Sequence, residues 1–257
     1  MGRVSHPDFL NGELPVGPSA IAAEGETHTP QGKKNYVTPR ALTIPEIHKI
    51  IEHYAEASER AITAGFDGVE IHGANGYLID QFIRDGSNLR QDDYGGTLEN
   101  RLRFLCEVTK AVCDKIGSDR VGVRLSPTSH YNSMNDSDPV GTFVRAAELL
   151  NDLNICYLHT LEALPGHMLA TEGSRVTPHI RKVFKNVLIT NGGYNLETGN
   201  KAINEGEGDA IAFGVPFLAN SDLIYRFKHN APLNAPDFAT LYTSGIEGYT
   251  DYPIIGI

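Results

Sequence analysis

The feature that most constrains the fold is a unit of one helix and one short apolar strand, which recurs five times along the chain. The first helix opens with a capping-box pattern, Thr43-Ile44-Pro45-Glu46, and continues with apolar residues at helical spacing until Gly65. Its strand follows at 68–73. The later helices are expected at 97–116, 142–153, 176–185 and 196–204, and their strands at 121–126, 155–159, 187–190 and 210–214. Apolar strands that alternate with helices are typical of a parallel sheet covered by helices.

The number of strands leaves two α/β folds open. Five strands are clear and residues 3–5 resemble the remnant of another, whereas a closed (β/α)8 barrel of the TIM type needs eight. The sheet is therefore either open and doubly wound, or an incomplete barrel that lacks its first two or three strands. Residues 1–40 are rich in glycine and proline and are expected to form loops with a short hairpin. Because no linker or low-complexity tract interrupts the chain, we expect a single domain over 1–257.

The charge balance limits the classes of partner that the chain can be expected to bind. The chain has 32 acidic and 22 basic residues, a formal net charge of −10, which argues against nucleic acid and against an anionic membrane surface. It has no run of roughly 20 apolar residues that could span a bilayer, and the segment from Met1 has no apolar signal region. Cys106 and Cys113 lie seven residues apart on one helix face and are expected to be buried free thiols. A cytoplasmic enzyme fits these features.

Polar side chains gather where the first strand ends. In parallel α/β folds ligands bind at the carboxyl ends of strands, and here His72, Asn75 and Tyr77 lie within one short turn. Two neutral donors can hold a carbonyl oxygen and stabilise negative charge on it, and a nearby tyrosine can deliver a proton. The alternative is that His72 is a hydrogen-bonded core histidine and Tyr77 a packing residue.

The second strand carries Arg124 among apolar residues. A guanidinium inside a barrel must be paired with an acid or with an anionic ligand. The sequence leaves both readings open: a ligand-binding arginine, or an internal salt bridge with Glu70 or Glu162.

Glycines follow the last two strands, at Gly192-Gly193 and at Gly214-Val215-Pro216. Their backbone amides could approach a phosphate, as happens after the final strands of many barrels, although turn geometry alone would also explain them. No metal site is expected, because His48 and His53 are five apart on a helix and the other histidines lack ligand spacing.

A long motif gives the chain its family resemblance. Residues 65–82 read GFDGVEIHGANGYLIDQF, and the pattern continues as RDGSNLR at 84–90 and DDYGGTLENR at 92–101. This run resembles the central signature of the Old Yellow Enzyme family, the FMN-dependent ene-reductases. Shorter matches extend the resemblance over the whole chain: GRVSHP at 2–7, VTPR at 37–40, VRLSP at 123–127, NGGY at 191–194 and GYTDYP at 248–253.

The resemblance implies a (β/α)8 barrel with FMN at its carboxyl face. NADPH or NADH would reduce the flavin, which would then pass hydride to an alkene conjugated to a carbonyl or nitro group. By position, His72 and Asn75 would hold the substrate oxygen, Tyr77 would protonate the α-carbon, and Arg124 would lie at the pyrimidine edge of the flavin. Backbone for the FMN phosphate would come from Gly192, Gly193 and Gly214.

The sequence departs from the family in two ways. Family members carry a further segment ahead of Gly2, which supplies the first barrel strands and several flavin contacts, so an N-terminal segment or a second copy would have to cover the open barrel edge. The family also usually has a phosphate-binding arginine where this chain has Val215. An inactive barrel fragment, or a partner-binding subunit that holds no flavin, is therefore the main alternative. A flavin-free barrel lyase that uses Arg124 and His72 is a third.

Overall fold

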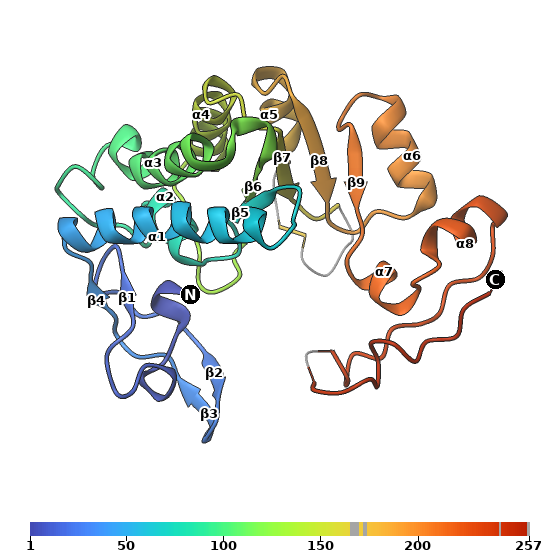
Figure 1. Ribbon diagram of the computed structural model, residues 1–257, viewed down its shortest axis with the longest axis horizontal. Helices are drawn as coiled ribbons and strands as arrows, with labels where there is room; N and C mark the ends of the chain where they lie inside the picture. The colour runs from blue at the N-terminus through green and yellow to red at the C-terminus, as the bar shows by residue number, and fades with distance from the viewer. Residues whose placement is uncertain (165–169, 172–173, 242, 256–257) are drawn as a thin grey trace.

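The protein is described here by a computed structural model that covers residues 1–164, 170–171, 174–241 and 243–255. At its centre is a five-stranded parallel sheet in the order β5-β6-β7-β8-β9 (Figure 1). The strands are β5 (Val69–His72), β6 (Val121–Leu125), β7 (Tyr157–Leu161), β8 (Val187–Asn191) and β9 (Ala210–Ala212). A doubly wound sheet reverses its strand order, whereas these neighbours follow the chain order throughout, as in a (β/α)8 barrel.

Five helices cover the outer side of the sheet, as the sequence predicts (Figure 1). They are α1 (Ile44–Thr63), α3 (Leu98–Ile116), α4 (Pro139–Asp152), α5 (Thr177–Val183) and α6 (Leu196–Asn204). The expected capping box is present, and Glu46 accepts the backbone N–H of Thr43 at 2.8 Å. Three short helices were not expected: α2 (Leu78–Ile83), α7 (Val215–Ala219) and α8 (Leu223–His229). Within the described ranges, none of the helices combines the length and the apolar character needed to cross a bilayer.

The N-terminal segment corrects one expectation. Gly2–Val4 forms a 3-10 turn and not the remnant of a strand. Gly2 has a φ of +67°, and the backbone N–H of Arg3 donates to the side chain of Gln81 rather than to a neighbouring strand. The expected hairpin is present as β2 (Glu26–Thr29) and β3 (Gly32–Asn35). The remaining elements of the segment are η2 (Pro7–Phe9) and the short parallel pair β1 (Val16–Gly17) and β4 (Arg40–Ala41).

The two faces of the sheet differ in chemistry. Ile71, Val123 and Leu158 point outward and are buried in the core beneath the helices. The alternate residues point to the inner face, where His72, Arg124 and His159 lie side by side in register. The sequence patterns suggested apolar residues on both faces, but the inner face is polar at His72, Arg124 and His159 and becomes apolar at Ile189 of β8.

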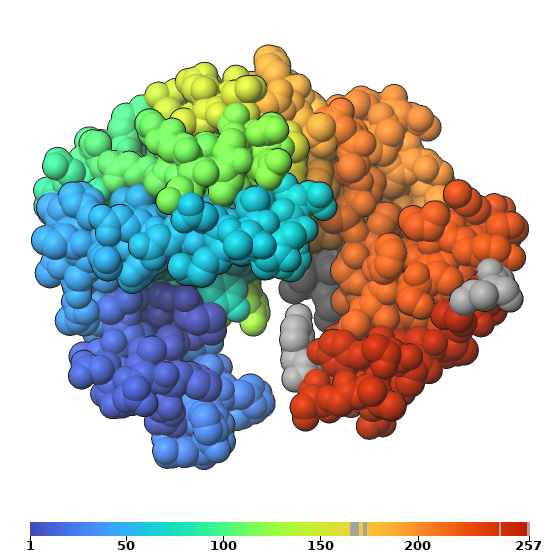
Figure 2. All heavy atoms as spheres, in the orientation of Figure 1, coloured from blue at the N-terminus to red at the C-terminus, as the bar shows by residue number. Residues whose placement is uncertain are grey.

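The sheet is open in the part of the chain that the structure describes, because β5 and β9 do not pair with each other. Five strands in chain order form an arc of a (β/α)8 barrel, three short of closure. Figure 2 shows a hollow between the N-terminal segment, in blue, and the C-terminal segment, in red. The segment or second copy expected to cover this opening stays a prediction.

The three cysteines are free. Cys106 and Cys113 lie half-buried on α3, and burial raises the pKa of each thiol to about 11. Cys156 is exposed at the approach to β7. The expectation of free thiols on one helix is confirmed, but Cys106 and Cys113 are half-buried and not fully buried as expected.

Candidate active site

The turn that leaves β5 has an unusual backbone. Asn75 and Gly76 both have a positive φ, +58° and +73°. Such left-handed residues let the chain reverse sharply, and Tyr77 then caps the start of α2. Before the turn, the N–H of Gly73 still bonds to the carbonyl of Arg124 at 2.9 Å, so the base of the turn remains attached to β6.

The turn and the strand end before it carry the three side chains that the sequence singled out. The rings of His72 and Tyr77 lie 5.4 Å apart between centroids, at an interplanar angle of 54°. Asn75 and Tyr77 line a cavity of about 810 Å³. The other lining residues come from the exits of β6 and β7 and include Thr128, Ser129, His130, Tyr131, Leu161 and Ala163. The cavity therefore lies at the carboxyl ends of the strands.

The electrostatics of His72 favour its neutral form. Burial lowers the pKa of the imidazole, and the nearby charge of Arg124 lowers it further. A neutral imidazole has one N–H to donate and carries no charge that must be compensated. His72 can therefore act as a neutral hydrogen-bond donor near neutral pH.

Arg124 has neither of the partners considered from the sequence. Its Nη2 donates to Oδ1 of Asn191 at 3.1 Å, and its buried Nε has no hydrogen-bond partner among the described residues. Glu70 pairs instead with His159, at 2.9 Å, and Glu162 with Arg175, at 3.6 Å. The guanidinium of Arg124 is half-buried and, among the described residues, contacts an amide and not an acid, which suits a ligand that brings an acceptor atom.

A polar cluster lies beside Arg124 on the inner face, and the sequence pointed only to its member Glu70, as a candidate partner of Arg124. The hydrogen bond with His159 and the charges of His159 and Arg124 outweigh the effect of burial and lower the pKa of Glu70. Burial and the charge of Glu70 raise the pKa of the Tyr157 hydroxyl. The Tyr157 ring lies over Gly122, where a Cβ would come within 2.1 Å of it. Alternation along β5 and β7 from His72 and His159 would have placed these residues on the inner face.

The glycines after the last strands have different roles. A Cβ on Gly192, which has a φ of +126°, would come within 2.7 Å of the carbonyl oxygen of Glu162, so close approach of the chain itself explains this glycine. Gly193 also has a positive φ, +80°. Nothing lies within 4 Å of a Cβ built on Gly214, so its backbone is accessible. Val215, 40% exposed, is the first residue of α7.

These features can be compared with what FMN requires. The guanidinium of Arg124, which has no acidic partner among the described residues, suits the acceptor atoms of a flavin pyrimidine edge, and the accessible backbone at Gly214 could face a phosphate. Val215 supplies no charge at the position where the resemblance expects an arginine. The residues therefore offer a side-chain donor for the ring of FMN, but for its phosphate they offer backbone amides alone. In the described part of the chain, no three side chains are grouped to hold a metal ion.

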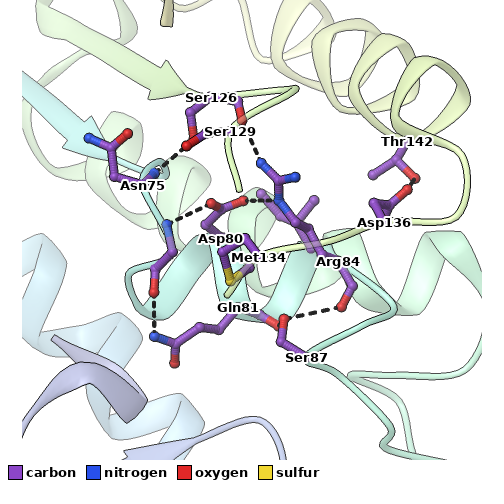
Figure 3. Close-up of polar contacts among 12 residues, drawn as sticks. Asn75, Asp80, Gln81, Arg84, Ser87, Ser126, Ser129, Met134, Asp136 and Thr142 are labelled. Atoms are coloured by element: carbon purple, nitrogen blue, oxygen red, sulfur yellow. Dashed lines mark hydrogen bonds and ion pairs between the residues drawn. The ribbon is translucent and has the colours of Figure 1, made fainter. Parts of the chain in front are cut away.

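The sequence reading also missed the residues that hold the turn. Asp80, Gln81 and Arg84 on and just after α2, and Ser126 after β6, all make hydrogen bonds to it or to one another (Figure 3). The spacing of Asp80 and Arg84, four residues apart, was a signal for a helical ion pair. No local pattern would have placed Ser126 beside them.

Comparison with known proteins identifies relatives along the whole chain. Residues 2–234 match the family model described as "NADH:flavin oxidoreductase / NADH oxidase family". The chain is 44% identical to 12-oxophytodienoate reductase 1 of Oryza sativa subsp. japonica over 262 residues, which cover 99% of this chain and 67% of that protein. It is 41% identical to 12-oxophytodienoate reductase 7 of the same plant, with coverage of 100% and 70%.

Solved structures agree with these relatives. The old yellow enzyme homologue from Zymomonas mobilis is 46% identical and superposes with a TM-score of 0.96, covering 99% of this chain and 72% of that one. Morphinone reductase in complex with tetrahydroNAD is 40% identical, with a TM-score of 0.91 and coverage of 99% and 70%. The match over residues 2–234 and the inner-face polar site lead to one conclusion: the chain belongs to the NADH:flavin oxidoreductase family of FMN-dependent Old Yellow Enzymes.

Proposed function

We propose that this oxidoreductase reduces the activated carbon–carbon double bond of α,β-unsaturated carbonyl or nitro compounds, with NADPH or NADH as the reductant of its FMN. The observation that carries the proposal is that Asn75 and Tyr77 line one cavity while the ring of His72 lies 5.4 Å from that of Tyr77. A volume of about 810 Å³ is suitable for a small organic substrate. The morphinone reductase complex with tetrahydroNAD supports a nicotinamide reductant.

The proposed roles follow from the chemistry of each side chain. His72 and Asn75 donate N–H groups to the carbonyl or nitro oxygen and stabilise the negative charge that develops on it. Tyr77 holds on its phenol oxygen the proton that passes to the α-carbon. Reduced FMN, when bound, supplies hydride to the β-carbon.

Other residues of the proposal serve the cofactor. Arg124 lies in the same inner-face row as His72, and its half-buried guanidinium would bind the pyrimidine edge of the flavin. The backbone of Gly193 and Gly214 would face the phosphate. Gly192 contributes through the tight turn that positions this backbone.

The test separates the two half-reactions. Tyr77→Phe removes the phenolic proton but keeps the ring, so alkene-dependent reoxidation of the flavin should slow by about 10²–10⁴-fold. Flavin reduction by NADPH or NADH should stay near the wild-type rate, because no proton from Tyr77 is needed in that step. Stopped-flow absorbance of the FMN-loaded protein measures both rates. Equal losses in both half-reactions would refute the proton-donor role.

The same material tests the alternative of a barrel that holds no flavin. Titration of the purified protein with FMN should give a saturable change in flavin absorbance or fluorescence. A protein that is colourless as isolated and shows no change on titration would contradict the proposal and favour a partner-binding role.

A further inference from the structure

The turn that carries the proposed catalytic residues needs outside support. Asn75 is not a glycine and yet occupies the left-handed region, and Gly76 follows it there. Left-handed backbone is unfavourable for residues with a Cβ and persists where the surrounding structure holds it. The position of Tyr77, the next residue, therefore depends on what holds the two preceding peptide groups.

A buried ion pair on α2 holds one of them. The side chain of Asp80 is 0% exposed and that of Arg84 2%, and the pair is joined by Nε and Oδ1 at 2.8 Å. The second oxygen of Asp80, Oδ2, accepts the backbone N–H of Gly76 at 2.8 Å. Gln81 of the same helix donates to the carbonyl of Gly76 at 2.7 Å.

The same ion pair reaches the next strand exit. Nη2 of Arg84 donates to the backbone carbonyl of Ser126 at 2.5 Å, and Oγ of Ser126 accepts the N–H of Asn75 at 2.8 Å. Figure 3 shows the resulting connection from Asn75 through Ser126, Arg84 and Asp80 back to the turn. Both left-handed N–H groups thus donate to acceptors in one buried network.

We propose that Asp80 and Arg84 are positioning residues for proton transfer, acting through the backbone of Asn75 and Gly76 on the placement of Tyr77. This inference rests on the function proposed above. Apolar residues of similar volume often stabilise a core as well as a buried ion pair does, whereas only a polar pair can accept the N–H of Gly76, so this contact favours a positional role. Displacement of a catalytic group by about 1 Å can lower a rate by about 10²-fold.

Asp80→Asn is the main test variant. The substitution preserves the shape of the side chain, but its NH₂ group must face one of two donors, Gly76 N–H or Arg84 Nε–H, so one hydrogen bond is lost. In FMN-loaded protein we expect alkene-dependent reoxidation of the flavin to slow by about 10-fold or more, with kcat affected more than KM. Flavin reduction by the nicotinamide should change by less than about 2-fold, since the turn does not take part in that step.

The chain offers a matched control on another helix. Asp222, the N-cap residue of α8, and Arg226 on that helix are also four residues apart, with Nε and Oδ1 2.7 Å apart and side chains 10% and 3% exposed. Arg226 also donates to backbone carbonyls, those of Pro232 and Pro253. Asp222→Asn should lower the melting temperature about as Asp80→Asn does, because each variant breaks one largely buried ion pair, while both half-reactions stay near wild type.

A second variant keeps the proposal testable if Asp80→Asn fails to fold. Ser126→Ala removes the acceptor for the N–H of Asn75 and leaves both charges in place. It should slow the same half-reaction selectively. In hydrogen–deuterium exchange, peptides that cover 73–84 should exchange faster in Asp80→Asn and in Ser126→Ala than in the wild type, a readout that does not depend on flavin.

The outcomes separate this inference from the proposed function. If Tyr77→Phe is selective but neither Asp80→Asn nor Ser126→Ala differs from Asp222→Asn, the positioning role is refuted and the proposed function stands. If Tyr77→Phe is itself unselective, the proposed function fails and the positioning role fails with it. Selective slowing in Tyr77→Phe, in Asp80→Asn and in Ser126→Ala supports both.

Discussion

Replacement of Gly76 by alanine is the most direct perturbation of the active-site turn. A Cβ at this position would lie 2.7 Å from Cβ of Asn132, 2.8 Å from Cγ of Met134 and 2.9 Å from the carbonyl oxygen of Tyr131. The φ of +73° adds a conformational cost of about 1–2 kcal/mol for any residue with a Cβ. Overpacking in a well-filled site adds about 1–3 kcal/mol, so Gly76→Ala should lower the free energy of unfolding by about 2–5 kcal/mol.

Urea unfolding followed by circular dichroism measures this loss, and Gly65→Ala is its control. Gly65 has a φ of +98° at the end of α1, and nothing lies within 4 Å of its Cβ position. Its replacement should therefore cost only the conformational part, about 1–2 kcal/mol. If Gly76→Ala is no more destabilising than Gly65→Ala, the segment 131–134 does not buttress the turn and the reasoning from close contacts is wrong.

Two further predictions concern the cofactor and the acid stability. Val215→Arg should tighten FMN binding by about 10-fold or more, because a charged hydrogen bond to phosphate contributes about 1.5–3 kcal/mol. Flavin titration measures the dissociation constant, and an unchanged value would place the phosphate elsewhere. Hydrogen bonds from Arg40 and Thr43 lower the pKa of Glu46 to about 2. Because this folded value is below the unfolded one, Glu46 stabilises the protein above pH 4.5 and the stabilisation is lost as the pH falls toward 2. Glu46→Gln should therefore show a smaller fall in melting temperature between pH 5 and pH 2 than the wild type, and an equal fall would contradict this assignment.

Local signals predicted most of the regular elements. The helix α6 spans 196–204 as expected, and α1 and α3 begin after Thr43 and Thr97, where capping side chains meet apolar residues at helical spacing. The helix α2 was missed because six residues are too few for a helical period to be recognised, although Asp80 and Gln81 lie between its apolar residues. The strand expected at 155–159 begins only at Tyr157 in the structure, because Tyr157 is its first residue with a partner on β6, which is Gly122. Strand ends depend on such partners, and a single segment does not encode them.

The candidate site was predicted only in part, because some of its contacts join residues that are distant in the sequence. His72, Asn75 and Tyr77 are close in the sequence, so a turn at a strand exit was enough to group them. The partner of Glu70 could not be predicted, because His159 is 89 residues away and lies on β7, two strands from β5. His72, Arg124 and His159 are neighbours on the inner face. Which of them pairs with Glu70 depends on how far each side chain extends across the sheet.

The sequence by itself determined the alternation of helices and strands and the polar turn at 72–77, since each depends on residues that are neighbours in the chain. The strand order, which separates an arc of a barrel from a doubly wound sheet, was decided by the tertiary structure. The tertiary structure alone decided what surrounds that turn. Ser126, 51 residues from Asn75, becomes its hydrogen-bond partner, and Arg84 joins that serine to Asp80 inside the core. Hydrogen bonds require atoms within about 3 Å of each other, and for distant segments only the packing of the whole sheet sets those distances.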